Sequence, residues 1–154
     1  MSSRDAAGPP GEGIALAEAL RRVVGGEIRF DKYSRQLFAR DASMYAIEPV
    51  GVVFPRDADD VVAVVQTAAQ FSVPVLPRGA GTSLAGQAVG QAIVMDLSRH
   101  LRTILDIDAE RLAARVQPGV VQEQLNLAAA AHGLMFGAGH FHPEPGHTRR
   151  DDRQ

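Results

Sequence analysis

The chain has 154 residues, which suits one domain with a hydrophobic core of its own. Its net charge of −2 gives no electrostatic basis for binding nucleic acid, and the absence of cysteine excludes disulfides, thiolate metal sites and a cysteine nucleophile within this chain. No apolar run has the length of a membrane span and no signal peptide is evident, so we expect a cytoplasmic location.

The N-terminal third predicts a tail, a helix and an irregular stretch. Residues 1–13 are small, polar and rich in glycine and proline, so we expect a flexible tail. Apolar residues at helical spacing from Ile14 to Val24 predict a helix, and the two glycines that follow are a stop signal. Residues 27–50 are less regular, and we expect their tyrosines to be partly buried under a loop.

The next segments predict a strand, a helix and a second strand. The apolar run 51–54 is typical of a buried strand. Asp57 is placed to cap a helix that ends near Phe71. Residues 73–76 follow as a short strand, in which Pro74 favours an edge position because it has no amide proton. This crossover predicts a parallel pair covered by the helix, with the following loop at the carboxyl end of the second strand.

That loop, residues 77–87, reads PRGAGTSLAGQ and contains three glycines and two hydroxyl side chains. Successive amides in such a loop form a concave anion site, where Thr82 and Ser83 can donate hydrogen bonds and Arg78 can balance charge. A loop that only makes a turn is equally compatible with the composition. Two nucleotide motifs are absent: the loop has no lysine, as a Walker site requires, and Leu84 replaces the last glycine of the dinucleotide pattern.

Further strands and one helix are predicted downstream. Residues 92–97 form a strand, and residues 103–107 and 112–116 form two more that pair antiparallel across a short polar connection. A helix begins at Val120 or Val121 and runs through Ala131, and the glycine after His132 closes it.

The last 17 residues, 138–154, differ in character because apolar residues almost vanish after Phe141, while three arginines, two aspartates and a glutamate are present. Three histidines lie there, at positions 140, 142 and 147. A disordered tail is favoured over a metal site, since a histidine pattern needs structural context before it indicates a ligand set.

Several motifs in order carry a resemblance to a known family. They are VFP at 53–55, VLPRGAGTSLAG at 75–86, MDLSR at 95–99 and VQPGV at 116–120, with RDAS at 40–43 upstream and HGL at 132–134 downstream. Together they resemble the FAD-binding domain of the vanillyl-alcohol oxidase and p-cresol methylhydroxylase flavoprotein superfamily, in its glycolate oxidase and D-lactate dehydrogenase branch. The resemblance implies an α+β fold of this type over residues 14–137, with an N-terminal βαβ lobe and a C-terminally incomplete, mainly antiparallel second lobe.

The resemblance also implies FAD as the cofactor. By this resemblance, the amides of residues 79–83 would hold the pyrophosphate, Gly86 and Gln87 would lie along the ribityl or flavin part, and Pro118 and Gly119 near the adenine or ribose. The implied cofactor-binding residues are Pro77, Arg78, Gly79, Ala80, Gly81, Thr82, Ser83, Leu84, Gly86, Gln87, Pro118 and Gly119. Thr82 stands where some relatives carry a histidine bonded to the flavin, so we expect noncovalent FAD. No catalytic residue and no metal ligand is assigned.

The function implied by the resemblance is FAD binding within a flavin-dependent oxidoreductase of the 2-hydroxy-acid dehydrogenase type. Nothing in the chain matches the family's substrate domain or the second part of its FAD domain. We therefore interpret the chain as a fragment that depends on a missing C-terminal half or partner subunit, with an open sheet edge and an apolar patch. The alternatives are an inactive fragment, a stand-alone flavin module, or a phosphate- or nucleotide-binding module without redox activity.

Overall fold

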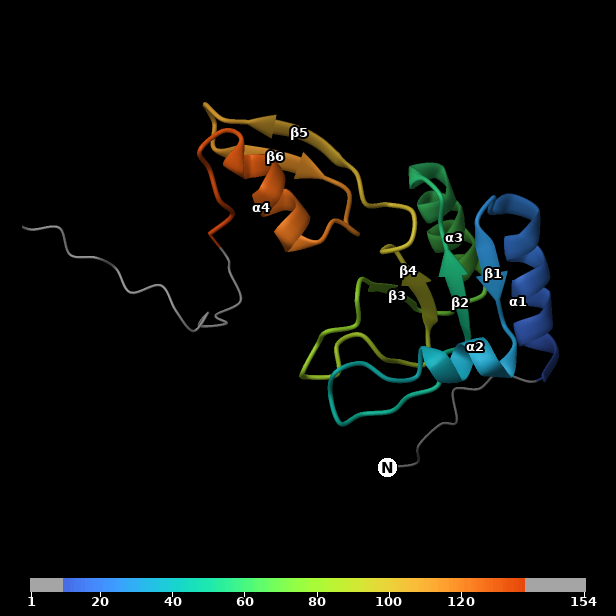
Figure 1. Cartoon of the computed structure of the whole chain (residues 1–154). Coiled ribbons are helices and arrows are strands. Elements are labelled where there is room, and N and C mark those ends of the chain that lie inside the picture. Colours follow the sequence, from blue (N-terminus) through green and yellow to red (C-terminus); the bar gives the residue numbers. More distant parts are fainter. Residues whose placement is uncertain (1–9, 138–154) are drawn as a thin grey trace, which may run out of the picture.

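Two lobes make up the part of the chain that the computed structural model describes, residues 10–137 (Figure 1). Residues 1–9 of the expected N-terminal tail lie outside the described residues, as does the whole of the expected C-terminal tail, 138–154, with its three histidines. The sheet lobe, residues 10–97, and the hairpin lobe, residues 104–137, mix helices and strands and confirm the predicted α+β class. The elements are α1 (Pro10–Val23), β1 (Glu27–Arg29), α2 (Lys32–Leu37), β2 (Gly51–Phe54), α3 (Ala58–Gln70), β3 (Val75–Arg78), β4 (Ile93–Asp96), β5 (Ile104–Asp108), β6 (Ala113–Val116) and α4 (Gln122–Ala130).

The sheet lobe is built on four strands in the order β1-β2-β4-β3. β2 and β3 both run parallel to β4, while β1 pairs antiparallel with β2. The prediction that β2 and β3 are parallel holds, but they are not neighbours, because β4 lies between them. All four residues of β4 are buried, as its position inside the sheet requires. β3 takes the predicted edge position, although Pro74, on which that prediction rested, directly precedes the strand and Pro77 lies within it.

The two faces of this sheet bury alternate residues. Val53, Ile93 and Met95 face α1 and α3, where Leu20 and Val64 are fully buried. On the opposite face a smaller cluster joins residues of β2 and β4 to Phe38, which follows α2. The second face therefore has a thinner cover than the first.

Helix α3 begins and ends where the sequence predicts. The Asp57 carboxylate accepts the N–H of Asp60 at 2.9 Å, which caps the helix, and Phe71 is the residue at its C-terminal end. The chain then turns through Ser72, which has a left-handed φ of 54°. This turn delays β3, so the strand occupies residues 75–78 and not the predicted 73–76.

The stretch between α1 and β2 holds structure that the sequence did not predict. β1 and α2 both form there, and Asp31 caps α2 by accepting the N–H of Ser34 at 2.9 Å. The expected partial burial of the tyrosines was wrong for Tyr33, which is 71% exposed, whereas Tyr45 is 52% exposed and packs one side of its ring against Gly86. Helix α1 also begins at Pro10, before the predicted start at Ile14, since proline fits the first helical turn.

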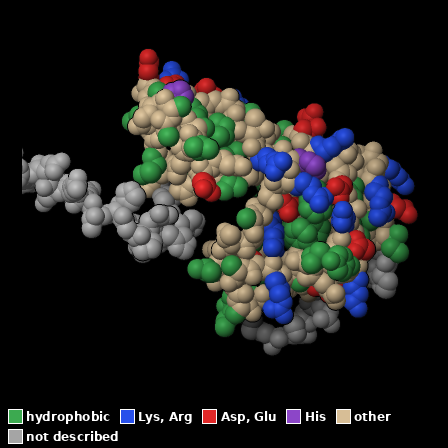
Figure 2. Space-filling model, viewed as in Figure 1, with side chains coloured by type: hydrophobic (Ala, Val, Ile, Leu, Met, Phe, Trp, Pro, Cys, Tyr) green, Lys and Arg blue, Asp and Glu red, His purple; other side chains and the backbone are tan. Residues whose placement is uncertain are grey.

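The hairpin lobe confirms the predicted antiparallel pair and the helix after it. β5 and β6 pair with a register shift between Ile104 and Asp106. α4 ends as predicted before Gly133, which has a φ of +69°. All four β6 residues are exposed, and hydrophobic side chains are visible over this lobe in Figure 2. Among residues 10–137, no helix is long and apolar enough to cross a bilayer.

Candidate functional site

The glycine-rich loop leaves the sheet at the carboxyl end of β3, as predicted. Arg78 pairs with Asp96 of β4, and the Leu97 N–H donates to the Arg78 carbonyl at 2.9 Å, so the strand ladder holds the root of the loop. Within the loop, Gly81 and Gly86 have φ values of +70° and +76°. Glycine is the residue that takes this conformation without steric cost, so both positions have a structural reason for their identity.

A run of backbone amides in this loop points at no protein acceptor. Among residues 10–137, none accepts a hydrogen bond from the N–H of residues 79–83. These amides are consecutive and include a left-handed residue at Gly81, and consecutive amides with such a residue among them are the backbone from which concave anion sites are built. A Cβ placed on Gly79 would have no heavy atom within 4 Å, so the backbone there is open to a ligand.

The Ser83 hydroxyl organises the rest of the loop. Its Oγ accepts the Gln87 N–H at 3.1 Å and the Ala85 N–H at 3.3 Å, and it donates to Gln87 Oε1 at 2.8 Å. The Ser83 proton that was expected to reach a phosphate oxygen is thus directed at Gln87. Thr82 is exposed, and Leu84 is 81% exposed at the tip of the loop.

Arg78 makes bonds within the protein that its sequence context did not predict. Its Nη2 donates to the carbonyl of Arg40 at 2.8 Å, and its Nη1 donates to the carbonyls of Ala88 at 3.0 Å and Phe38 at 3.3 Å. The guanidinium also lies 5.1 Å from the centroid of the Phe38 ring. Arg78 therefore ties both ends of the glycine loop to residues 38–46, which we call the clamp segment.

Asp41 ties the clamp segment to the loop from the other side. Its Oδ2 accepts the Ala88 N–H at 3.2 Å, and its Oδ1 accepts the Ser43 hydroxyl at 2.5 Å and the Ser43 N–H at 2.9 Å. These bonds, led by the one from the Ser43 hydroxyl, together with the positive charge of Arg78, hold the pKa of Asp41 below its ordinary value. The Ala42 N–H adds a bond to the Gly81 carbonyl at 3.0 Å.

The glycine loop and the clamp segment pack so closely that side chains at two of the loop glycines would collide with Arg78 or with Tyr45. A Cβ on Gly81 would lie 2.5 Å from an Arg78 Nη atom, and a Cβ on Gly86 would lie 2.6 Å from the Tyr45 ring. Tyr45 thus covers Gly86 with one side of its ring and exposes the other. The two glycines allow both the turn and the packing of the clamp segment.

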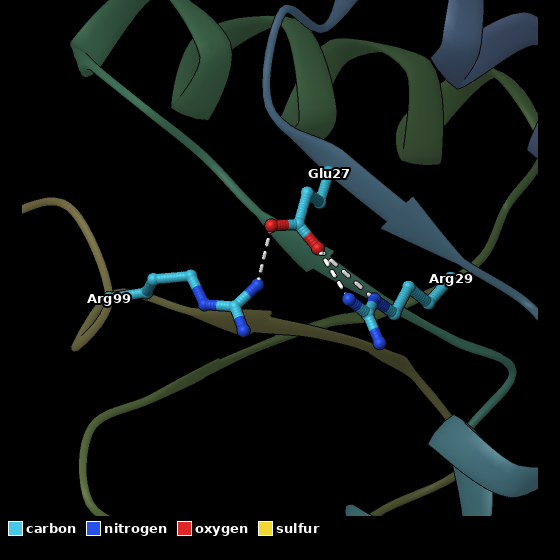
Figure 3. Close-up of polar contacts among 3 residues, drawn as sticks. All are labelled: Glu27, Arg29 and Arg99. Carbon is cyan, nitrogen blue, oxygen red and sulfur yellow. Dashed lines mark hydrogen bonds and ion pairs between the residues drawn. The ribbon is translucent and has the colours of Figure 1, made fainter.

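A second polar feature lies on the thinly covered face of the sheet. A pocket of about 480 Å³ is lined there by three arginines, two serines and the Phe38 and Phe54 rings among others. Glu27 bridges two of the arginines, with its carboxylate 2.6 Å from Arg99 and 2.7 Å from Arg29 (Figure 3). Hydrogen bonding by Arg29, reinforced by the charges of both arginines, lowers the pKa of Glu27. Both guanidinium groups lie over Phe54, so this cluster packs the edge of the sheet.

Pro118 and Gly119 stand at the junction of the lobes, beside Leu97, whose N–H donates to the Arg78 carbonyl at the root of the glycine loop. The Gly119 N–H donates to the Leu101 carbonyl at 2.7 Å, and a Cβ on Gly119 would collide with the carbonyls of Leu97 and Leu101. Within residues 10–137, no hydrogen bond, ion pair or ring contact joins Pro118 or Gly119 to the loop. The structure thus holds residues 77–87 in one loop and places Gly119 against Leu97, next to the root of that loop, and the assignment of Pro118 and Gly119 to the cofactor site stays a prediction.

The hairpin lobe has an apolar pocket of about 250 Å³ between the strands and α4. Leu125 and Ala129 line it from α4, and Leu134, Met135 and Phe136 close one side. Met135 is 77% exposed and Phe136 is 51% exposed, so the apolar cover of this lobe is partial.

Sequence reasoning missed that the clamp segment belongs to the site. Asp41 and Tyr45 lie about forty positions before the loop, and contacts over that distance leave no periodic pattern. One local signal was present: an aspartate two residues before a serine is typical of a tight turn in which the carboxylate accepts backbone and hydroxyl protons. That signal predicts a turn but not its partner.

Comparison with curated proteins finds relatives that are named as dehydrogenases and as oxidase subunits. The chain is 46% identical to D-2-hydroxyglutarate dehydrogenase of Pseudomonas putida over 123 residues, which are 77% of this chain and 12% of that protein. It is 34% identical to glycolate oxidase subunit GlcD of Bacillus subtilis over 125 residues, or 79% of this chain and 26% of that protein. The chain thus spans about an eighth to a quarter of the length of these relatives.

Among solved structures, p-cresol methylhydroxylase with substrate bound matches 82% of this chain and 26% of its own, with a TM-score of 0.70 and 20% identity. An alkyldihydroxyacetonephosphate synthase matches 78% of this chain with a TM-score of 0.67 and 19% identity. These similarities show the fold, which confirms the expected p-cresol methylhydroxylase type. The FAD-binding domain family itself matches residues 49–146, more than half of the chain and the whole of the glycine loop. The chain therefore belongs to the FAD-binding domain family.

Proposed function

We propose that this chain is the pyrophosphate-binding part of a flavin-dependent 2-hydroxy-acid dehydrogenase and holds FAD noncovalently through residues 79–83. The family fixes the cofactor, and the named relatives act as dehydrogenases or oxidases of D-2-hydroxyglutarate, glycolate and D-lactate. We propose the reaction class for a longer protein that contains such a chain, because the match spans only a small part of each relative.

The observation that carries the proposal is the run of unpaired amides at the carboxyl end of β3. Ligands of α/β sheets bind beyond that end of the strands, and pyrophosphate needs several donors within reach of one another. The amides of residues 79–83 provide them without a protein competitor among the described residues. The open backbone at Gly79 allows the phosphate oxygens to come within hydrogen-bonding distance.

The cofactor and the chain divide the chemistry between them. When bound, FAD supplies the acceptor for a hydride removed from a substrate C–H bond. The loop amides bind and orient the pyrophosphate, and Tyr45, half exposed beside Gly86, limits access to that end of the loop. Thr82 has no nitrogen or sulfur nucleophile to bond the flavin ring, which supports noncovalent binding.

Reconstitution of the purified chain with FAD tests the proposal. We expect the chain to retain FAD on gel filtration, with flavin absorbance at roughly 450 nm that belongs to the cofactor. Acid precipitation should leave the flavin in the supernatant, because no covalent bond holds it. A chain that stays colourless at millimolar FAD contradicts the proposal, and flavin in the acid pellet contradicts its noncovalent part.

We further propose that the hairpin lobe is completed by a C-terminal half or by a partner subunit. The two-stranded sheet of β5 and β6, the exposed Met135 and Phe136 and the greater length of the relatives support this. A two-stranded sheet is marginal in water, and exposed apolar patches favour association. We expect the isolated chain to bind an apolar dye and to self-associate on gel filtration. A monomer that binds no dye and unfolds in one sharp transition contradicts this.

A further inference from the structure

We propose that Arg78 and Asp41 are positioning residues: they fix the glycine loop against the clamp segment before FAD arrives, and neither binds phosphate. The inference rests on the proposed function only for the identity of the ligand. The structural part of the inference is that two side chains of opposite charge hold the loop in place even when no cofactor is bound.

The hydrogen bonds of Arg78 show that its guanidinium serves the protein backbone. Its two terminal nitrogens donate to three carbonyl oxygens, those of Phe38, Arg40 and Ala88, at 2.8 to 3.3 Å. These carbonyls come from both sides of the contact, two from the clamp segment and one from the residue that follows the loop. A planar guanidinium satisfies several fixed acceptors at once, which the single ammonium of lysine does not reproduce in the same geometry.

Asp41 provides the complementary bond in the opposite direction. Its carboxylate accepts the Ala88 N–H at 3.2 Å, next to the Ala88 carbonyl that accepts from Arg78 at 3.0 Å. Ala88 is therefore held through both of its backbone polar groups. The Ser43 hydroxyl and N–H fix the rotamer of the carboxylate at 2.5 and 2.9 Å.

The two residues leave the amides of the loop free for a ligand. The backbone contacts to the clamp segment are made by the Gly81 carbonyl and by Ala88, and neither uses an amide of the unpaired run. Donors that are already ordered bind an anion without the entropic cost of ordering a mobile loop. The clamp segment thus supplies pre-organisation, and the amides supply the binding.

Substitution at Arg78 separates geometry from charge. We expect Arg78→Lys and Arg78→Gln to weaken FAD binding to a similar extent, about tenfold or more, because both lose bonds to the carbonyls. If Arg78 acted as a phosphate ligand through its charge, the lysine variant would restore most of the affinity lost in the glutamine variant. Rescue by Arg78→Lys therefore overturns the proposal.

Amide hydrogen exchange on the chain without FAD gives a readout that does not depend on the cofactor. The Ala42 N–H, bonded to the Gly81 carbonyl, and the Ala88 N–H, bonded to Asp41, report directly on the contact. We expect exchange at Ala42 to accelerate about tenfold in Arg78→Lys and in Asp41→Asn, as the contact opens more often. Unchanged exchange at Ala42 in both variants contradicts the proposal.

Arg102→Lys is the matched control, because Arg102 is exposed and makes no hydrogen bond or ion pair with the described residues. It should leave both FAD affinity and exchange at Ala42 unchanged. A double variant of Arg78 and Asp41 should weaken FAD binding by less than the product of the single effects, since both act on one contact. If the wild-type chain binds no FAD, the proposed function fails, while the exchange measurement still decides whether the two residues hold the loop.

Discussion

The sheet lobe and the hairpin lobe differ in how completely they bury their apolar residues. Every residue of β2 and β4 is buried, whereas every residue of β6 is exposed. Two helices cover one face of the four-stranded sheet, but the hairpin has only α4, of which Ala129 alone is buried. Burial of apolar area is the main source of stability, so the sheet lobe carries the fold and the glycine loop that grows from it.

The helices show the same difference at their N-termini. Asp57 caps α3 with its side chain, while Val121 precedes α4 and has no side-chain oxygen to accept an amide proton. The hairpin lobe therefore combines weak burial with an uncapped helix. This agrees with a lobe that reaches its full stability only with additional chain packed on it.

The largest expected effect comes from a cavity in the sheet lobe. Leu20 on α1 is fully buried, and Leu20→Ala should lower the free energy of unfolding by about 3 kcal/mol. Leu127→Ala removes the same atoms from α4, where Leu127 is 79% exposed, and should change it by less than about 0.5 kcal/mol. Urea denaturation followed by circular dichroism measures both. Equal losses would show that the lobes are equally packed.

The junction of the lobes gives the next largest effect. Gly119→Ala places a methyl group against the carbonyls of Leu97 and Leu101, and the strain should cost about 2 kcal/mol. Gly137→Ala is the control, because its methyl group meets no heavy atom within 4 Å among the described residues. Urea denaturation again provides the measurement. A Gly119→Ala variant as stable as the control would mean that the lobes are not held together at this point.

Substitutions at the N-cap residues test whether helix capping contributes to the difference in stability between the two lobes. Asp57→Ala should destabilise the sheet lobe by about 1 kcal/mol, since the Asp60 N–H loses its acceptor. Val121→Asp introduces an acceptor at the start of α4 and should protect the amides of that helix from exchange by up to about 1 kcal/mol. Hydrogen exchange resolved by residue measures both. Loss of protection in α4 after Val121→Asp would contradict the assignment of Val121 as its cap position.

The smallest effect is expected at the Glu27 bridge on the sheet lobe (Figure 3). Its pKa lies below the ordinary value of 4.5, so its contribution to stability is present above that pH and is lost as the pH falls through the lowered value. In Glu27→Gln, the free energy of unfolding should therefore fall less steeply as the pH is lowered, and urea denaturation at a series of pH values measures this slope. Glu123→Gln, an exposed carboxylate on α4, is the control. A slope unchanged in Glu27→Gln would show that the bridge does not contribute.

Local patterns predicted the parts of this fold that are determined locally. The apolar run 51–54, the cap at Asp57 and the glycine after His132 each specify an element through neighbouring residues, and the structure confirms all three. The position of β4 between β2 and β3 depends on pairing between distant segments, which no local period records. β1, with three residues, is too short to show a period at all.

In the candidate site, too, the sequence predicted the feature that depends on local composition and not the contacts between distant segments. The composition of residues 77–87 predicted where an anion site lies, and the structure places this loop at the carboxyl end of β3. The assignment of Arg78 as a charge partner for phosphate rested on residue type alone, because the sequence does not show which carbonyls lie within its reach. Only the fold brings Arg40 and Asp41 beside it.

A titration of FAD into the wild-type chain and into Gly79→Val tests the central claim most directly. A side chain at Gly79 points into open space, so the variant should fold normally and obstruct only a ligand held by the amides. We expect the wild type to bind FAD at one site, Gly79→Val to bind at least about a hundredfold more weakly, and Gly137→Val to bind as the wild type does. Equal FAD binding by the wild type and Gly79→Val would contradict the claim that this loop holds the cofactor.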